Sequence, residues 1–213
     1  MLSMSTDWVD WHRRYDDPGS ALSRRLRIVQ AQVVAFLNET APAPVKVVSA
    51  CAGEGRDLLE VLADRRDGDR VDATLLEYDD RNVARATGYA RRHGLNRITV
   101  TRADAGRSDA YTAAVPADLV MMCGIFGNIN DEAVRRLIGA LPRFCGPGAT
   151  VLWTRHRRPP DLTGPIRRWL MEAGFEEVSF IAPDGELFSV GRHRLVGEPA
   201  EFVPGLRLFD FIR

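Results

Sequence analysis

The spacing of apolar residues divides the chain into helical stripes and short strand-like runs. Near the N-terminus, apolar residues recur on one helical face, at Leu22, Leu26, Val29 and Val33. From residue 46 onward, short apolar runs alternate with stretches of helical periodicity. The strand-like runs are 46–50, 73–78, 97–101, 118–123 and 149–154. Because strands that alternate with helices form right-handed crossovers, this order predicts a mostly parallel sheet covered on both faces.

The last part of the chain has a different pattern. Three strand-like runs, at 176–182, 188–196 and 206–212, follow one another without a helical stretch between them. We expect an antiparallel edge, with one of the three runs not forming a strand. The predicted fold is a Rossmann-like, doubly wound α/β sheet with this C-terminal edge and an N-terminal helical extension. A single domain is expected, with the extension at 1–40 and the core at 46–213.

The amino-acid composition excludes several classes of protein. Of the 213 residues, 45% are apolar and 27% are charged, which excludes a disordered chain, a collagen and a coiled coil. The 29 basic and 29 acidic residues cancel, whereas a general nucleic-acid binder usually carries a basic excess. No apolar run reaches the length of a membrane span, and the charged N-terminus is not typical of a signal peptide. We therefore expect a cytoplasmic protein without a nucleic-acid or membrane partner.

The clearest chemical signal is the segment VVSACAGEGRDLLEVL, residues 47–62. A buried strand runs into a turn with Gly53 and Gly55, and the turn opens a helix. Free N–H groups at the start of that helix favour an anionic ligand group. A dinucleotide fingerprint needs a third glycine where this chain has Leu58. The turn alone is equally typical of a tight strand–helix connection without a ligand.

Two acidic residues follow the next two strands. Glu77 ends the second strand, near the spacing at which an acid binds ribose hydroxyls in nucleotide-binding α/β folds. A role for Glu77 as a helix cap is less favoured, because Asp79 and Asp80 follow it. Asp104 comes after the third strand, with a solvated loop acid as its alternative. Since parallel strands end at one edge of a sheet, both acids are expected beside the glycine turn.

Together these segments resemble the motifs of class I S-adenosylmethionine-dependent methyltransferases, over roughly half of the chain. The resemblance implies S-adenosylmethionine as cofactor, with Glu77 on the ribose, Tyr78 against the adenine and Asp104 on the adenine amino group. The residues that it implies at the cofactor are Ser49, Ala50, Cys51, Gly53, Gly55, Glu77, Tyr78, Asp104, Ala105, Cys123 and Gly124. The loop departs from the family's Gly-x-Gly-x-Gly at Cys51, and Ser49 replaces a frequent acid.

The resemblance implies methyl transfer by in-line displacement, which depends on positioning more than on a catalytic triad. The loop CGIFGN at 123–128 lacks the proline signature of many family members that methylate nucleic acids. Together with the neutral charge, this favours a small-molecule O or N acceptor. The candidates for a general base are His156, His12 and Tyr15, and those for substrate contacts are Trp11, Tyr15 and Phe126. For all of these, a surface or packing role is the alternative.

Two other classes of function remain open. One is a non-catalytic relative that keeps the fold, because Ser49 and Cys51 depart from the family pattern. The other is a nicotinamide-dependent oxidoreductase. The missing third glycine counts against it, as does the single lysine, Lys46, which leaves no Tyr-x-x-x-Lys pair. The spacing of cysteines and histidines is not typical of a metal site.

Overall fold

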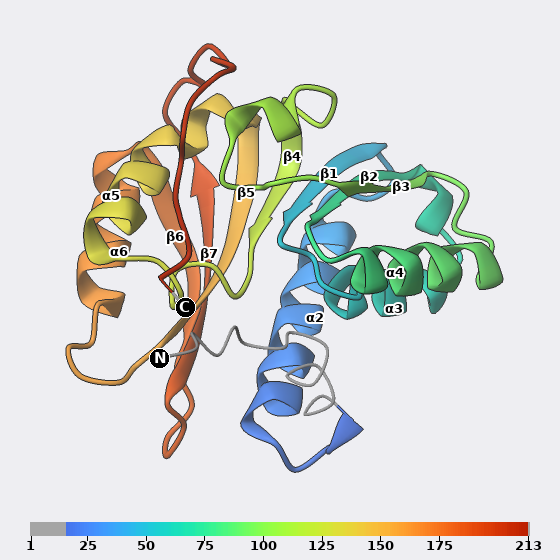
Figure 1. Cartoon of the computed structure of the whole chain (residues 1–213), viewed down its shortest axis with the longest axis horizontal. Helices are drawn as coiled ribbons and strands as arrows, with labels where there is room; N and C mark the ends of the chain where they lie inside the picture. The colour runs from blue at the N-terminus through green and yellow to red at the C-terminus, as the bar shows by residue number, and fades with distance from the viewer. Residues whose placement is uncertain (1–15, 213) are drawn as a thin grey trace, which may run out of the picture.

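The computed structural model of the protein describes residues 16–212. They form a seven-stranded sheet with helices on both faces (Figure 1). The strands are β1 (Val45–Ala50), β2 (Val71–Glu77), β3 (Ile98–Arg102), β4 (Ala117–Met122), β5 (Cys145–His156), β6 (Phe175–Ile181) and β7 (Phe188–Leu195). The helices are α2 (Ala21–Glu39), α3 (Arg56–Ala63), α4 (Asp80–Arg92), α5 (Asp131–Ala140) and α6 (Thr163–Glu172).

The strand order across the sheet is β3-β2-β1-β4-β5-β7-β6. The first five strands along the chain pair in parallel, and β7 pairs antiparallel with both β5 and β6. The predicted fold class, a doubly wound and mostly parallel sheet with an antiparallel edge, is confirmed. Among the three strand-like runs of the tail, the one at 206–212 is not a strand. It makes an isolated bridge between Arg207 and Arg107, because its backbone bonds to Gly106 and Ser108 after β3 and not to a strand of the sheet.

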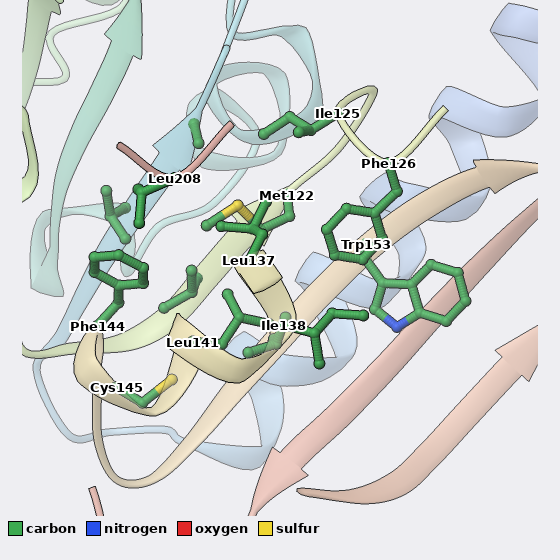
Figure 2. Close-up of a cluster of buried hydrophobic side chains, with 14 of the residues drawn as sticks. Met122, Ile125, Phe126, Leu137, Ile138, Leu141, Phe144, Cys145, Trp153 and Leu208 are labelled. Atoms are coloured by element: carbon green, nitrogen blue, oxygen red, sulfur yellow. The ribbon is translucent and has the colours of Figure 1, made fainter. Parts of the chain in front are cut away.

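Alternate residues of the central strands point to opposite faces, and each face has its own helices. On β4, Val120 and Met122 join a cluster with α5 and α6, whereas Leu119 and Met121 join one with α2, α3 and α4. Figure 2 shows part of the first cluster, in which α5 side chains pack near Met122 and Trp153. Both faces of a parallel strand are therefore buried, as its near-continuous apolar sequence predicts.

Helix α2 is tied to the sheet by side chains along its length. Ser20 caps it by accepting from the backbone N–H of Ser23. Farther along, Gln30 donates to Glu60 of α3, and Glu39 pairs with Arg192 of β7 at 2.8 Å. Arg25 and Leu26 of this helix line the site described below. Although α2 has 19 residues, no helix between residues 16 and 212 is long and apolar enough to cross a membrane.

Candidate functional site

The chain reverses its direction of travel across the sheet between β1 and β4, which are neighbours. From β1 it runs outward through β2 and β3, and then returns to start β4 on the other side. In open α/β sheets, ligands bind where this reversal leaves a crevice beyond the carboxyl ends of the strands. A cavity of about 720 Å³ lies here, within the roughly 300–1,000 Å³ typical of small-molecule sites. Its lining includes Arg25, Cys51, Gly53, Asp57, Glu77, Tyr78, Asp104, Ala105, Cys123, Gly124, Asn128 and Phe211.

The turn after β1 has three residues in the left-handed conformation. Their φ angles are 52° at Cys51, 58° at Gly53 and 71° at Gly55. Gly55 precedes α3, and a Cβ added there would lie 2.6 Å from Leu75 Cδ2. Glycine is therefore required at Gly55 for both its conformation and its packing. Cys51 is the only non-glycine residue with positive φ among residues 16–212, so the departure from the family pattern leaves strain in the turn.

The carboxylate of Glu77 joins the end of β2 to this turn. One oxygen, Oε2, accepts from the backbone N–H of Gly53 at 2.7 Å, and Oε1 accepts from that of Asp79 at 2.8 Å. Glu77 is only 9% exposed, yet it lines the cavity. Each carboxylate oxygen keeps a further lone pair for a ligand hydroxyl. Asp79, not Glu77, caps α4 by accepting from the N–H of Arg81, as the sequence indicates.

Tyr78 follows β2, and Asp104 follows the neighbouring strand β3. Tyr78 is 69% exposed, and the Arg102 guanidinium lies 5.8 Å from its ring centre. Asp104 accepts from the N–H of Gly106 at 2.9 Å through Oδ1. The buried Tyr111 donates its hydroxyl to the carbonyl of Ala105 at 2.9 Å, which holds this turn against the core. The segments after β2 and β3 thus offer the cavity an exposed ring and a carboxylate.

The loop after β4 divides its side chains between the cavity and the core. Cys123, Gly124 and Asn128 line the cavity, and the Asn128 side chain donates to the carbonyl of Gly124 at 2.7 Å. Phe126 is fully buried, with its ring centre 5.9 Å from that of Trp153 (Figure 2). The structure thus places Phe126, which was expected at the substrate, in the core and outside the cavity lining. The large apolar side chain gains more from burial in the core than from a place at an open cavity.

Other expected residues lie away from the cavity wall. Ser49 and Ala50 are 1% exposed and lie inside the sheet, while Gly55 shapes the turn without lining the cavity. Ser49 and Ala50 are buried within β1, and Gly55 is packed against Leu75 and Leu59. His156 ends β5 and does not line the cavity. Its ring packs against Gly127, where an added Cβ would lie 3.2 Å from the His156 Cδ2 atom. The candidates His12, Tyr15 and Trp11 lie outside the described residues.

Sequence reasoning overlooked Asp57 as a site residue. It lies in the first turn of α3, where an acid usually has a helix-dipole role and faces solvent. Here it lines the cavity, and its Oδ1 is shielded from solvent without a hydrogen-bond partner in the described structure. Burial raises the pKa of the Asp57 carboxyl to about 6. Only its position two residues after Gly55 pointed toward the site.

Two more overlooked residues come from the ends of the described chain. Arg25 of α2 and Phe211 of the C-terminal segment both line the cavity. No local motif marks them, because long-range packing brings them there.

Two cysteine thiols line the same cavity. Burial raises the pKa of the Cys123 thiol far above its usual range, and the carboxylate of Asp57 adds to the effect. The Cys51 thiol is shifted upward in the same way, by burial and then by Glu77 and Asp104. Both thiols are therefore neutral and weakly nucleophilic.

Comparisons with known proteins agree with this architecture. The chain resembles a possible exported protein from Bordetella parapertussis, with 21% identity and a TM-score of 0.67 over 90% of this chain and 79% of that one. It also resembles the magnesium protoporphyrin IX methyltransferase from Synechocystis PCC 6803. With bound SAH, that enzyme gives 15% identity and a TM-score of 0.67, covering 89% of this chain and 94% of that one. With bound SAM, the same enzyme gives 14% identity and a TM-score of 0.68, covering 89% of this chain and 91% of that one.

At these identities the likeness establishes a shared Rossmann-like fold. No curated protein matches the sequence. A family model described as "Putative methyltransferase" matches residues 23–172. The match extends from α2 to the end of α6 and includes the turn after β1, the acids after β2 and β3, and the loop after β4. The chain belongs to this methyltransferase family.

Proposed function

We propose that the protein transfers a methyl group from S-adenosylmethionine to an oxygen or nitrogen atom of a small molecule. One observation carries this proposal. The Glu77 carboxylate lies in the wall of the crevice beyond β1 and β4, bonded at 2.7 Å to the backbone of the left-handed turn. An acid at this place, beside a strained Gly-rich turn, is suited to the vicinal hydroxyls of a ribose.

The residues around the cavity fit the adenosine part of this cofactor. Glu77 would accept hydrogen bonds from the ribose hydroxyls, and the exposed ring of Tyr78 would pack against the adenine. Asp104 would accept from the adenine amino group, beside Ala105. The turn from Cys51 to Gly53 brings backbone close to the ligand without large side chains.

Methyl transfer then depends mainly on how the two reacting groups are positioned. The cofactor supplies a methyl group on a sulfonium, which is already a good leaving group. The chain holds the acceptor atom in line with that methyl group and shields both from water. Cys123, Gly124 and Asn128 line the part of the cavity after β4, which would face the acceptor. An acceptor that must lose a proton needs a base, for which His156 at the end of β5 stays the candidate among the described residues.

A small acceptor is favoured over a nucleic acid by the balance of charge and by the size of the cavity. Basic and acidic residues are equal in number. The chain therefore has no overall excess of positive charge for the phosphate contacts that dominate nucleic-acid binding. The cavity of about 720 Å³ must hold the cofactor as well as the acceptor. The space beyond the cofactor suits a compact molecule.

Calorimetric titration tests the proposal directly. We expect micromolar binding of S-adenosylmethionine and S-adenosylhomocysteine, with no binding of NADH. At 100 times its dissociation constant, a ligand adds about 2.7 kcal/mol to the stability, which a shift in melting temperature reports. Binding of NADH instead would support an oxidoreductase. Binding of the two sulfur ligands without turnover of any acceptor in a broad panel would identify a non-catalytic relative.

A further inference from the structure

Asp57 leaves a polar atom unsatisfied in the wall of the cavity. Its Oδ1 is shielded from solvent, and it has no hydrogen-bond partner among residues 16–212. A buried carboxylate without full compensation costs stability. Burial raises its pKa most, and the backbone N–H groups of Asp57 and Leu58 counter this only in part. The arrangement is typical of a group that gains its partner when a ligand binds.

The charges around the cavity fall into two groups. Cys51 lies within the electrostatic reach of Glu77 and Asp104, which form the part assigned to adenosine. Cys123 lies within the reach of Asp57 and Arg25 instead. Asp57 and Arg25 therefore belong to the part of the cavity next to the loop after β4. There, a buried acid and a guanidinium from α2 line the same wall.

An acid beside a guanidinium is complementary to a zwitterion. A free α-amino acid group has an ammonium for the acid and a carboxylate for the guanidinium, and the start of α3 adds favourable N–H groups for the carboxylate. Ser49 does not supply a charge to this region, since it is uncharged and 1% exposed inside the sheet. The acid that the turn lacks at the end of β1 is thus present eight residues later, on α3.

We propose that Asp57 binds the α-ammonium group of the cofactor's amino-acid part, with Arg25 beside it for the carboxylate. This inference rests on the proposed function. Asp57 is a binding residue in this assignment and gives specificity for a cofactor with an intact amino-acid end. A cationic group on the methyl acceptor is the other ligand with the same chemistry, and the choice of ligands below separates the two.

Two ligands that differ only at the amino-acid end test this assignment. S-adenosylhomocysteine carries the zwitterion, whereas 5′-methylthioadenosine keeps the adenosine and the thioether without it. We expect Asp57→Asn to weaken binding of S-adenosylhomocysteine by roughly 10- to 100-fold, as for a lost charged hydrogen bond. Binding of 5′-methylthioadenosine should stay within about twofold. Asp64→Asn is the matched control, because Asp64 is exposed at the other end of α3.

The pH dependence of binding gives a second readout. Below about pH 6, protonation of Asp57 removes the charge that attracts the ammonium. The affinity of the unaltered protein for S-adenosylhomocysteine should therefore fall as the pH drops from about 7 to 5, while that of Asp57→Asn changes little. The charged groups that act on Asp57 are Arg25 of α2 and Glu60 of α3.

The outcomes separate this inference from the proposed function. Equal weakening of both ligands would show that Asp57 acts through the fold, and unchanged affinity for both would place the ammonium elsewhere. Either result overturns the inference while the proposed function stands. If the unaltered protein binds neither ligand, the proposed function fails first. Asp57→Ser, checked by its melting curve, repeats the comparison should the asparagine variant fold poorly.

Discussion

Arg207 and Asp104 are joined by an ion pair of 2.5 Å, although 103 residues separate them along the chain. The same guanidinium also contacts Asp210. The backbone N–H of Leu208 donates to the carbonyl of Gly106 at 2.8 Å, and Phe211 reaches the cavity wall. The last described residues therefore lie across the turn that carries Asp104, and Leu208 anchors them in the core (Figure 2).

We predict that Arg207→Ala weakens binding of S-adenosylhomocysteine by roughly three- to tenfold, because Asp104 loses the group that orients it. Both side chains of the pair are more than 40% exposed, so the loss of folding stability should stay below about 1 kcal/mol. Calorimetry and a urea titration measure the two effects. Arg97→Ala removes a similarly exposed pair with Asp72 and serves as the control. An equal effect of both variants on affinity would contradict the role of Arg207.

Glu77→Ala is expected to weaken cofactor binding by about 1–3 kcal/mol, since the ribose hydroxyls lose their acceptor. It should also lower the stability, because the N–H groups of Gly53 and Asp79 lose theirs. Glu77→Gln keeps one acceptor oxygen and should give a smaller loss of affinity. Asp72→Ala alters an exposed acid on the same strand and should bind normally. A folded Glu77→Ala protein with unchanged affinity would refute the assignment.

Two glycines allow backbone strain to be separated from packing. Gly55 and Gly94 both have positive φ, of 71° and 66°. A Cβ at Gly55 would lie 2.6 Å from Leu75 Cδ2, whereas a Cβ at Gly94 meets nothing within 4 Å. Gly94→Ala should cost about 1 kcal/mol of backbone strain. Gly55→Ala should cost about 1–3 kcal/mol more, from overpacking. Chemical denaturation of both variants measures the difference, and similar losses would show that the turn adapts.

Asp57 makes the stability of the ligand-free protein depend on pH. Its folded pKa of about 6 lies above the ordinary value of 3.8, so the folded state binds the proton more tightly. The stability from this group is complete below about pH 4 and is lost as the pH rises through 6. Asp57→Asn should therefore be more stable than the unaltered protein above pH 6, by about 2–3 kcal/mol. Melting curves at several pH values check this, and a constant difference would disprove it.

Much of the fold follows from local patterns. Apolar runs buried on both faces predict parallel strands, and the helices between them determine the doubly wound order. That order brings the glycine turn, Glu77 and Asp104 to one edge of the sheet. Spacing and topology alone therefore predict that all three lie at the cavity. They do not predict which neighbouring residues form its wall, since Ser49 and Ala50 are buried inside the sheet.

Long-range packing decided the remainder. The run at 206–212 alternates like a strand, but its hydrogen bonds to Gly106 and Ser108 and the pair of Arg207 with Asp104 hold it across the turn after β3. Phe126 and Cys123 share one loop, and the shape of the core determined that the ring is buried while the thiol reaches the cavity. In the sequence, Asp57 looks like an ordinary acidic residue in the first turn of a helix. Its buried, unpaired oxygen is a property of the tertiary structure, in which Arg25 of α2 and Cys123 after β4 lie near it. The desolvation of a charge depends on neighbours that are distant in sequence.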